Sequence, residues 1–185
     1  MILRRGLATL VAIVALGGSS QVAVAQAALT VSAGASLPMG DYGKYANTGY
    51  LATVGLLFKV GEKGLSVGGQ GLFGANSHSD YDGDKTTLMG ALGSVVYRLG
   101  DATKPGVSLI GNVGMLQHKY SSDQFPNEEG SSSGVAYGGG AAFTVPRGRM
   151  SVYLAIRYLM ASIENETTAF VPIQAGVTIP LGGNK

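Results

Sequence analysis

The chain has 185 residues, enough for one domain with a substantial core, and it contains neither cysteine nor tryptophan. Disulfide scaffolds and thiol chemistry are therefore excluded. The 13 basic and 11 acidic side chains become equal in number once Arg4 and Arg5 are set aside as part of a removable leader, so nothing in the charge indicates a nucleic-acid partner.

Residues 1–27 have the pattern of a secretory signal peptide. Arg4 and Arg5 form a basic start, residues 7–16 form an uncharged apolar run, and small residues surround Ala25. The run is shorter than the roughly 20 residues that a membrane-spanning helix needs, and no cysteine follows it to carry a lipid. We predict an exported protein, cleaved after Ala25 or Ala27, with a single domain at residues 28–185.

Eight stretches of the remaining chain alternate apolar with small or polar residues, which is the side-chain period of β-strands. They cover residues 29–37, 50–59, 65–73, 86–99, 107–120, 134–145, 151–160 and 170–181. The first and last stretches are similar enough to pair and close a barrel, although in a soluble sandwich the same apolar faces would meet a second sheet. We predict an all-β fold, a closed up-and-down antiparallel barrel of eight strands.

The last stretch shows the alternation most clearly. In a transmembrane barrel its apolar face would meet lipid, and its small, polar face, with Gln174, Gly176 and Thr178, would line the lumen. The predicted lipid-facing residues are Val171, Ile173, Ala175, Val177 and Ile179.

The two ends of this predicted barrel differ in the length of their connections and in their charge. The connections at residues 38–48, 75–85, 121–133 and 161–168 are long and polar, whereas the other three are short. The long-loop end carries nine acidic side chains: Asp41, Asp80, Asp82, Asp84, Asp123, Glu128, Glu129, Glu164 and Glu166. The short-turn end is mainly basic. Long outer loops with short inner turns are typical of outer-membrane barrels.

The chain resembles the small outer-membrane β-barrel family of OmpA/OmpX type over residues 29–181. The resemblance rests on SAGASLP from Ser32 with GDY from Gly40, VYRL from Val96, AIRY from Ala155 and VPIQAGV from Val171. It implies the bacterial outer membrane, contact with the bilayer and lipopolysaccharide, and insertion by the outer-membrane machinery. Many family members end on an aromatic residue, whereas this chain ends on Lys185. That difference leaves a soluble periplasmic barrel open.

Acidic and histidine residues in the loops are the candidates for chemistry. Asp80, Asp82 and Asp84 alternate as in a weak calcium loop, but Lys85 and Ala91 stand where a hand-type loop needs glycine and glutamate. A solvated acidic loop is the favoured interpretation. His78 is interpreted as a solvated loop residue, and no Gly-x-Ser-x-Gly motif accompanies it. The sequence therefore predicts no catalytic residue, cofactor or firm metal site.

Inward-facing polar residues predict a network inside the barrel. Its predicted members are Gln70, Asn112, His118, Tyr153 and Arg157. A buried arginine needs a partner, and because no acid is obvious on the inward faces, we expect carbonyl groups, Tyr153 or water to serve. An eight-stranded barrel is just wide enough for side chains to fill, so the network is interpreted as a plug rather than an ion path.

The sequence favours a non-enzymatic outer-membrane protein with a structural or surface-interaction role through its acidic loops. Two alternatives remain. One is a lipocalin-like barrel that binds a small apolar ligand, and the less favoured one is a lipid-modifying barrel enzyme. The extracellular partner is not indicated by the sequence.

Overall fold

The computed structural model describes residues 27–79, 84–122, 130–163 and 166–182. One short 3-10 helix, η1 (Tyr42–Lys44), lies among eight strands. The strands are β1 (Ala27–Met39), β2 (Gly49–Val60), β3 (Leu65–Ser77), β4 (Lys85–Arg98), β5 (Gly106–Ser121), β6 (Gly130–Arg147), β7 (Met150–Ile163) and β8 (Glu166–Pro180). In this described part of the chain, no helix is long and apolar enough to cross a membrane.

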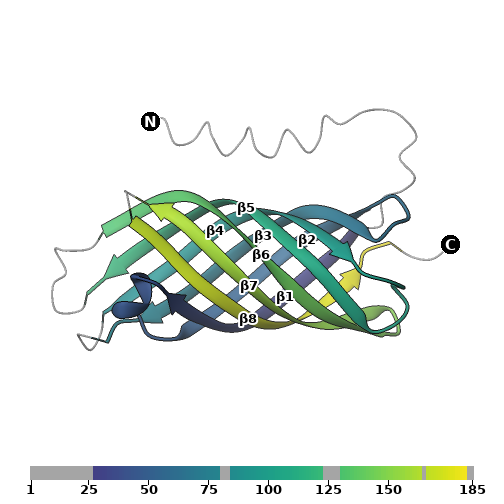
Figure 1. Cartoon of the computed structure of the whole chain (residues 1–185), viewed down its shortest axis with the longest axis horizontal. Coiled ribbons are helices and arrows are strands. Elements are labelled where there is room, and N and C mark those ends of the chain that lie inside the picture. Colours follow the sequence, from purple (N-terminus) through teal and green to yellow (C-terminus); the bar gives the residue numbers. More distant parts are fainter. Residues whose placement is uncertain (1–26, 80–83, 123–129, 164–165, 183–185) are drawn as a thin grey trace.

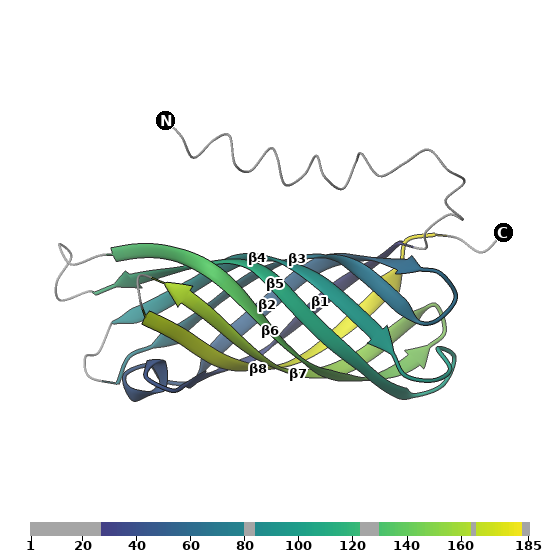
Figure 2. The ribbon, with the colours of Figure 1, turned by 45° about the horizontal axis from the view of Figure 1, so that its top comes forward.

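Each strand pairs antiparallel with its sequence neighbour, and β1 pairs with β8, so the sheet closes on itself. The closing register places Val31 opposite Val177 and Ala33 opposite Ala175. Figures 1 and 2 show the strands inclined to the long axis, with the start of β1 and the end of β8 at one end and η1 at the other. The predicted eight-stranded up-and-down antiparallel barrel is confirmed.

The strands continue further toward the η1 end than the sequence predicted. The expected long connection at residues 161–168 is wrong, because β7 runs to Ile163 and β8 begins at Glu166. Ala161, Ile163 and Thr168 are buried on the inward face, so the alternation persists through this segment. β3, β5 and β6 are also longer at this end. In β6, the exposed side chains of Ser131 and Ser133 interrupt the apolar pattern while the backbone ladder with β5 continues.

The two faces of the barrel wall differ sharply in character. Large apolar side chains on the outer face are exposed, among them Val54, Val113, Leu154 and Ile156, each more than half accessible. The buried residues are inward-facing, and they include small, polar and aliphatic side chains. The core of this fold is therefore the lumen itself.

Candidate functional site in the barrel lumen

Apolar side chains fill the half of the lumen nearer to η1. They come from β2 to β8 and form one cluster: Leu51, Leu72, Leu88, Leu92, Leu116, Ala136, Leu159, Ala161, Ile163 and Phe170. Leu51 and Leu88 have no accessible surface. Leu88 and Leu92 of β4 both belong to this cluster. It blocks the lumen as a hydrophobic plug.

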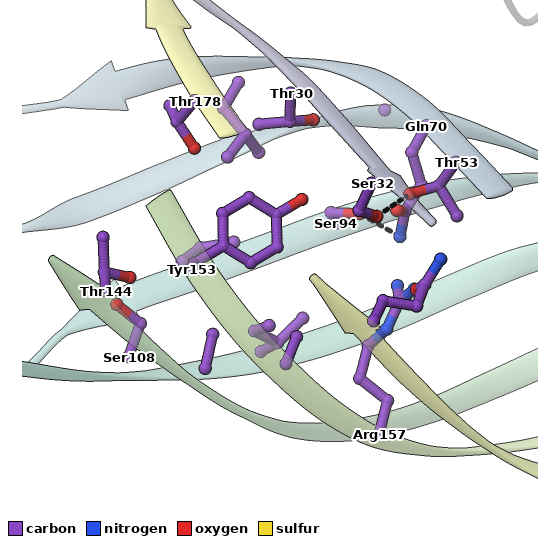
Figure 3. A pocket seen from close by; sticks show the side chains of 17 residues that line it. Thr30, Ser32, Thr53, Gln70, Ser94, Ser108, Thr144, Tyr153, Arg157 and Thr178 are labelled. Carbon is purple, nitrogen blue, oxygen red and sulfur yellow. Dashed lines mark hydrogen bonds between the residues drawn. The ribbon is translucent and has the colours of Figure 1, made fainter. Parts of the chain in front are cut away.

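A cavity of about 90 Å³ occupies the half of the lumen toward the chain ends. Polar side chains from all eight strands line it, and Figure 3 shows several of them directed into the same space: Thr30, Ser32, Thr53, Gln70, Ser94, Ser108, Thr144, Tyr153, Arg157 and Thr178. We call this space the lumen cavity. It lies on the far side of the hydrophobic plug from η1.

Arg157 lies on β7 at the boundary between the plug and the cavity. Only 5% of its surface is accessible. Nη1 donates a hydrogen bond to Asn112 Oδ1 at 3.4 Å, and Nη2 donates one to Gln174 Oε1. Nε has no hydrogen-bond partner among the described residues. The guanidinium is thus held by two neutral amide oxygens rather than by a carboxylate.

A second group of hydrogen bonds crosses the cavity wall. Ser94 Oγ accepts from Gln70 Nε2 at 3.1 Å and from Asn112 Nδ2 at 2.8 Å. Ser32 Oγ and Thr53 Oγ1 are 2.7 Å apart, which links β1 to β2. Gln70, Asn112, Tyr153 and Arg157, four of the five predicted network members, therefore lie in one half of the lumen.

Tyr153 occupies space that a glycine leaves open. A Cβ atom added to Gly176, opposite it on β8, would lie 2.5 Å from Tyr153 Cζ. The tyrosine ring therefore extends across the cavity at a position where any larger residue on β8 would collide with it. Thr178 lines the cavity beside it, and a Cβ atom added to Gly176 would point inward, toward Tyr153 and Ser32.

His118, the fifth predicted network member, lies elsewhere in the barrel. It is on β5 toward the η1 end, where its Nδ1 atom is 3.5 Å from Thr168 Oγ1. The apolar cluster separates this position from the lumen cavity. The side chain of His118 lies beside Thr168 rather than in the predicted network, because position along the barrel axis decides which residues meet, and the alternation does not carry that information.

A layer of polar and aromatic side chains covers the plug at the η1 end. Tyr42 is almost fully buried, and burial raises the pKa of its hydroxyl above the ordinary value. The ring of Tyr45 makes edge contacts with those of Tyr42 and His78, and His78 in turn packs on Tyr120. The Nε2 atom of His78 lies 2.8 Å from Thr86 Oγ1. His78 is therefore part of a packed layer rather than the solvated loop residue that the sequence suggested.

Asn76 fastens this layer to the barrel. Its Nδ2 group donates to the backbone carbonyls of Ser36, at 3.1 Å, and Asn47, at 2.8 Å. Its Oδ1 atom accepts from Ser36 Oγ at 3.2 Å. The side chain has no accessible surface. The sequence gave Asn76 no role, because it falls in a stretch predicted as loop.

Asp84 is the one member of the calcium candidate that the structure describes, since Asp80 and Asp82 lie outside the described residues. It is 3% accessible. Hydrogen bonds from Ser122 and then from the Tyr120 hydroxyl hold the pKa of its carboxyl below the ordinary value. Within the described residues, no group of three or more potential ligands could hold a metal ion.

The predicted lipid-facing residues lie on the outer face of β8. Val171, Ile173, Ala175, Val177 and Ile179 alternate with inward Pro172, Gln174, Gly176 and Thr178. On the same outer face, Tyr50 and Phe73 pack with their ring centres 6.3 Å apart near the η1 end. Tyr97 lies outward at the turn end of β4. We call this continuous apolar outer surface the outer belt.

Solved structures similar to this chain are small membrane barrels. One is neisserial surface protein A, with a TM-score of 0.65, 10% sequence identity, and coverage of 84% of this chain and 97% of that one. Another is Ail, the attachment invasion locus protein of Yersinia pestis, solved with the heparin analogue sucrose octasulfate, with a TM-score of 0.57, 15% identity, and coverage of 83% and 99%.

Ail without that ligand also matches, at a TM-score of 0.54 and 17% identity over 84% of this chain and 99% of the other. No family model matches the chain, and no curated protein sequence does. This chain has the fold of the small eight-stranded outer-membrane β-barrels. The resemblance inferred from its sequence is confirmed at the level of the fold.

Proposed function

We propose that this protein is a non-enzymatic outer-membrane barrel with a closed lumen, which acts as a surface-interaction protein through its η1 end. The observation that carries this proposal is the outer belt. A water-soluble protein rarely exposes a large continuous apolar patch, whereas here such a patch encircles the barrel. Lipid is the solvent that matches this surface, and the lumen then holds the polar residues.

The closed lumen argues against the lipocalin-like alternative. Sites for small organic ligands commonly enclose about 300–1,000 Å³ and are mainly apolar. The apolar half of this lumen is filled by its own side chains, and the lumen cavity measures about 90 Å³. A drug-sized apolar ligand has no matching space there. The same plug opposes a role as an open pore.

The positions of the histidines argue against a lipid-modifying enzyme. Such an enzyme needs its base on an outward rim, where the lipid lies. His78 and His118 instead have the hydroxyl groups of Thr86 and Thr168 beside them on the inward side. His78 belongs to the packed layer over the plug, and His118 belongs to the lumen wall. This placement supports a non-catalytic role.

Charge at the η1 end suggests the kind of partner. Nine acidic side chains belong to this end of the chain by sequence, against three basic ones, Lys44, Lys85 and Lys119. The fold neighbour Ail was solved with a sulfated, strongly anionic ligand. An acidic surface would repel such a ligand, so we propose a cationic partner surface for this protein. Lys85 and Lys119, on adjacent strands just beyond the outer belt, would face lipopolysaccharide phosphates.

Cysteine labelling of intact cells tests the location and orientation together. The chain has no native cysteine. Asp41→Cys, beside η1, should react with a membrane-impermeant maleimide, whereas Arg149→Cys, in the turn before β7, should react only after lysis. Labelling of Arg149→Cys alone in intact cells would reverse the orientation. Recovery of the unlabelled wild-type protein in the soluble periplasmic fraction would overturn the membrane location.

A further inference from the structure

The lumen cavity contains a cation that no described acidic group balances. Arg157 lies in the cavity wall and is 95% buried, since 5% of its surface is accessible. Its hydrogen-bond partners, Asn112 and Gln174, are uncharged. Among the described residues that line the cavity there is no aspartate or glutamate. In the described parts of the chain, the one salt bridge joins Asp41 to Lys44, beside η1. A buried charge without a counterion is costly.

Hydrogen-bond donors that have no described acceptor also border this cavity. A guanidinium has five N–H donors, and the described hydrogen bonds of Arg157 use two of them, with Nε unpartnered. Ser94 Oγ already accepts two amide hydrogen bonds, so its own hydroxyl proton points away from both amides. Figure 3 shows Ser94 and Arg157 bordering the same space. Such a space favours an occupant that accepts hydrogen bonds.

We propose that the lumen cavity binds a small monovalent anion of chloride size against Arg157. The space open to the centres of water-sized bodies in this cavity is about 90 Å³, several times the roughly 10–15 Å³ that holds one water. A chloride-sized ion with accompanying waters fits this volume. The bound ion balances the guanidinium charge and accepts hydrogen bonds from the Ser94 hydroxyl and from the Arg157 Nη hydrogens that Asn112 and Gln174 do not use. It therefore stabilises the folded barrel.

An internal carboxylate should replace the anion. Asn112→Asp is nearly isosteric and places a carboxylate where an oxygen already lies 3.4 Å from Arg157 Nη1. The matched control is Gln117→Glu, which makes the same charge change on the exposed outer side of the same strand. The probe is sodium bromide, exchanged for sodium gluconate at constant ionic strength. The readout is the urea midpoint of the barrel folded in neutral-lipid vesicles.

In the wild type and in Gln117→Glu, the midpoint should rise with each tenfold increase in bromide. In Asn112→Asp it should stay flat across the exchange and exceed the wild-type midpoint in gluconate. Equal bromide dependence in all three proteins, or none in the wild type, overturns the proposal and leaves water as the partner of Arg157.

A second measurement needs no variant. Crystals of the wild-type barrel soaked in bromide should give an anomalous peak in the lumen cavity, beside the guanidinium of Arg157. Peaks on the outer surface alone overturn the proposal.

Discussion

Gln174 Nε2 donates a hydrogen bond to the backbone carbonyl of Leu51 at 3.3 Å, although their strands, β8 and β2, are not neighbours. β1 lies between them, and its residue at this level is Gly34, which pairs with Leu51 on one side and Gln174 on the other. Because glycine has no side chain, the amide can cross β1. The same amide accepts from Arg157, so it joins three strands at the boundary between plug and cavity.

Gly34→Ala should destabilise the barrel. An added Cβ atom would lie 1.9 Å from the Ile173 carbonyl oxygen and 2.7 Å from Gln174 Cα, so backbone must move. Overpacking of this kind costs about 1–3 kcal/mol. Equilibrium urea unfolding in lipid vesicles should report that loss. The control is Gly111→Ala on β5, where an added Cβ meets nothing within 4 Å. If both variants unfold at the wild-type midpoint, Gly34 has no such spacing role.

The strand pattern could be predicted from sequence because alternation marks which side chains share a face. It correctly placed Gln174, Gly176 and Thr178 inward. It did not find Gln174 as the partner of Arg157, because such a contact depends on strand stagger around the barrel. Nor did it separate His118 from the other predicted network members.

The division of the lumen into plug and cavity was also missed. Its signal was available in the sequence: Leu72, Leu116 and Leu159 occupy inward positions in the halves of their strands that lie toward the η1 end. Once the strand directions are known, leucines at these positions indicate a hydrophobic layer at one end. Asn76 carried no such signal, because its partners are backbone carbonyls, which any sequence supplies.

Asn76→Ala should loosen the layer that covers the plug. The substitution removes the donor for two backbone carbonyls and the acceptor for the Ser36 hydroxyl, all at a fully buried position. Leaving buried polar groups unpaired costs about 1–3 kcal/mol. Hydrogen exchange should rise at the backbone amide of Asn47, which donates to Ser77 at 2.7 Å. Asn47→Ala, at an exposed side chain, is the matched control. Equal exchange in the two variants would contradict the role of Asn76.

Acid stability should depend on Asp84. Hydrogen bonds from Ser122 and Tyr120 lower the pKa of this carboxyl from its ordinary value of 3.8. A lowered pKa in the folded state means that the contribution to stability is present above pH 3.8 and is lost as the pH falls through the lowered pKa. Ser122→Ala and Tyr120→Phe should each raise the pKa and shift acid unfolding to higher pH.

Carboxyl NMR titration measures this pKa directly. The internal control is Asp101, whose pKa is lowered by the backbone and hydroxyl of Thr103 within its own turn. Its titration should not change in either variant. If the pKa of Asp84 is the same in both variants as in the wild type, the two hydrogen bonds are not the cause of its lowered value.

A lysine on the outer face of β8 should be costly in proportion to its depth in the bilayer. Ala175 lies near the middle of the outer belt, paired with Ala33 on β1 and Leu154 on β7, whereas Val171 and Ile179 lie nearer the two ends. Ala175→Lys should cost about 2–4 kcal/mol, and Val171→Lys and Ile179→Lys about 0–1 kcal/mol. The free energy of unfolding from lipid vesicles measures all three. In a soluble barrel, tolerance would follow packing rather than depth. A penalty that does not peak at position 175, or a wild-type barrel that folds in buffer without lipid or detergent, would contradict lipid contact at the outer belt.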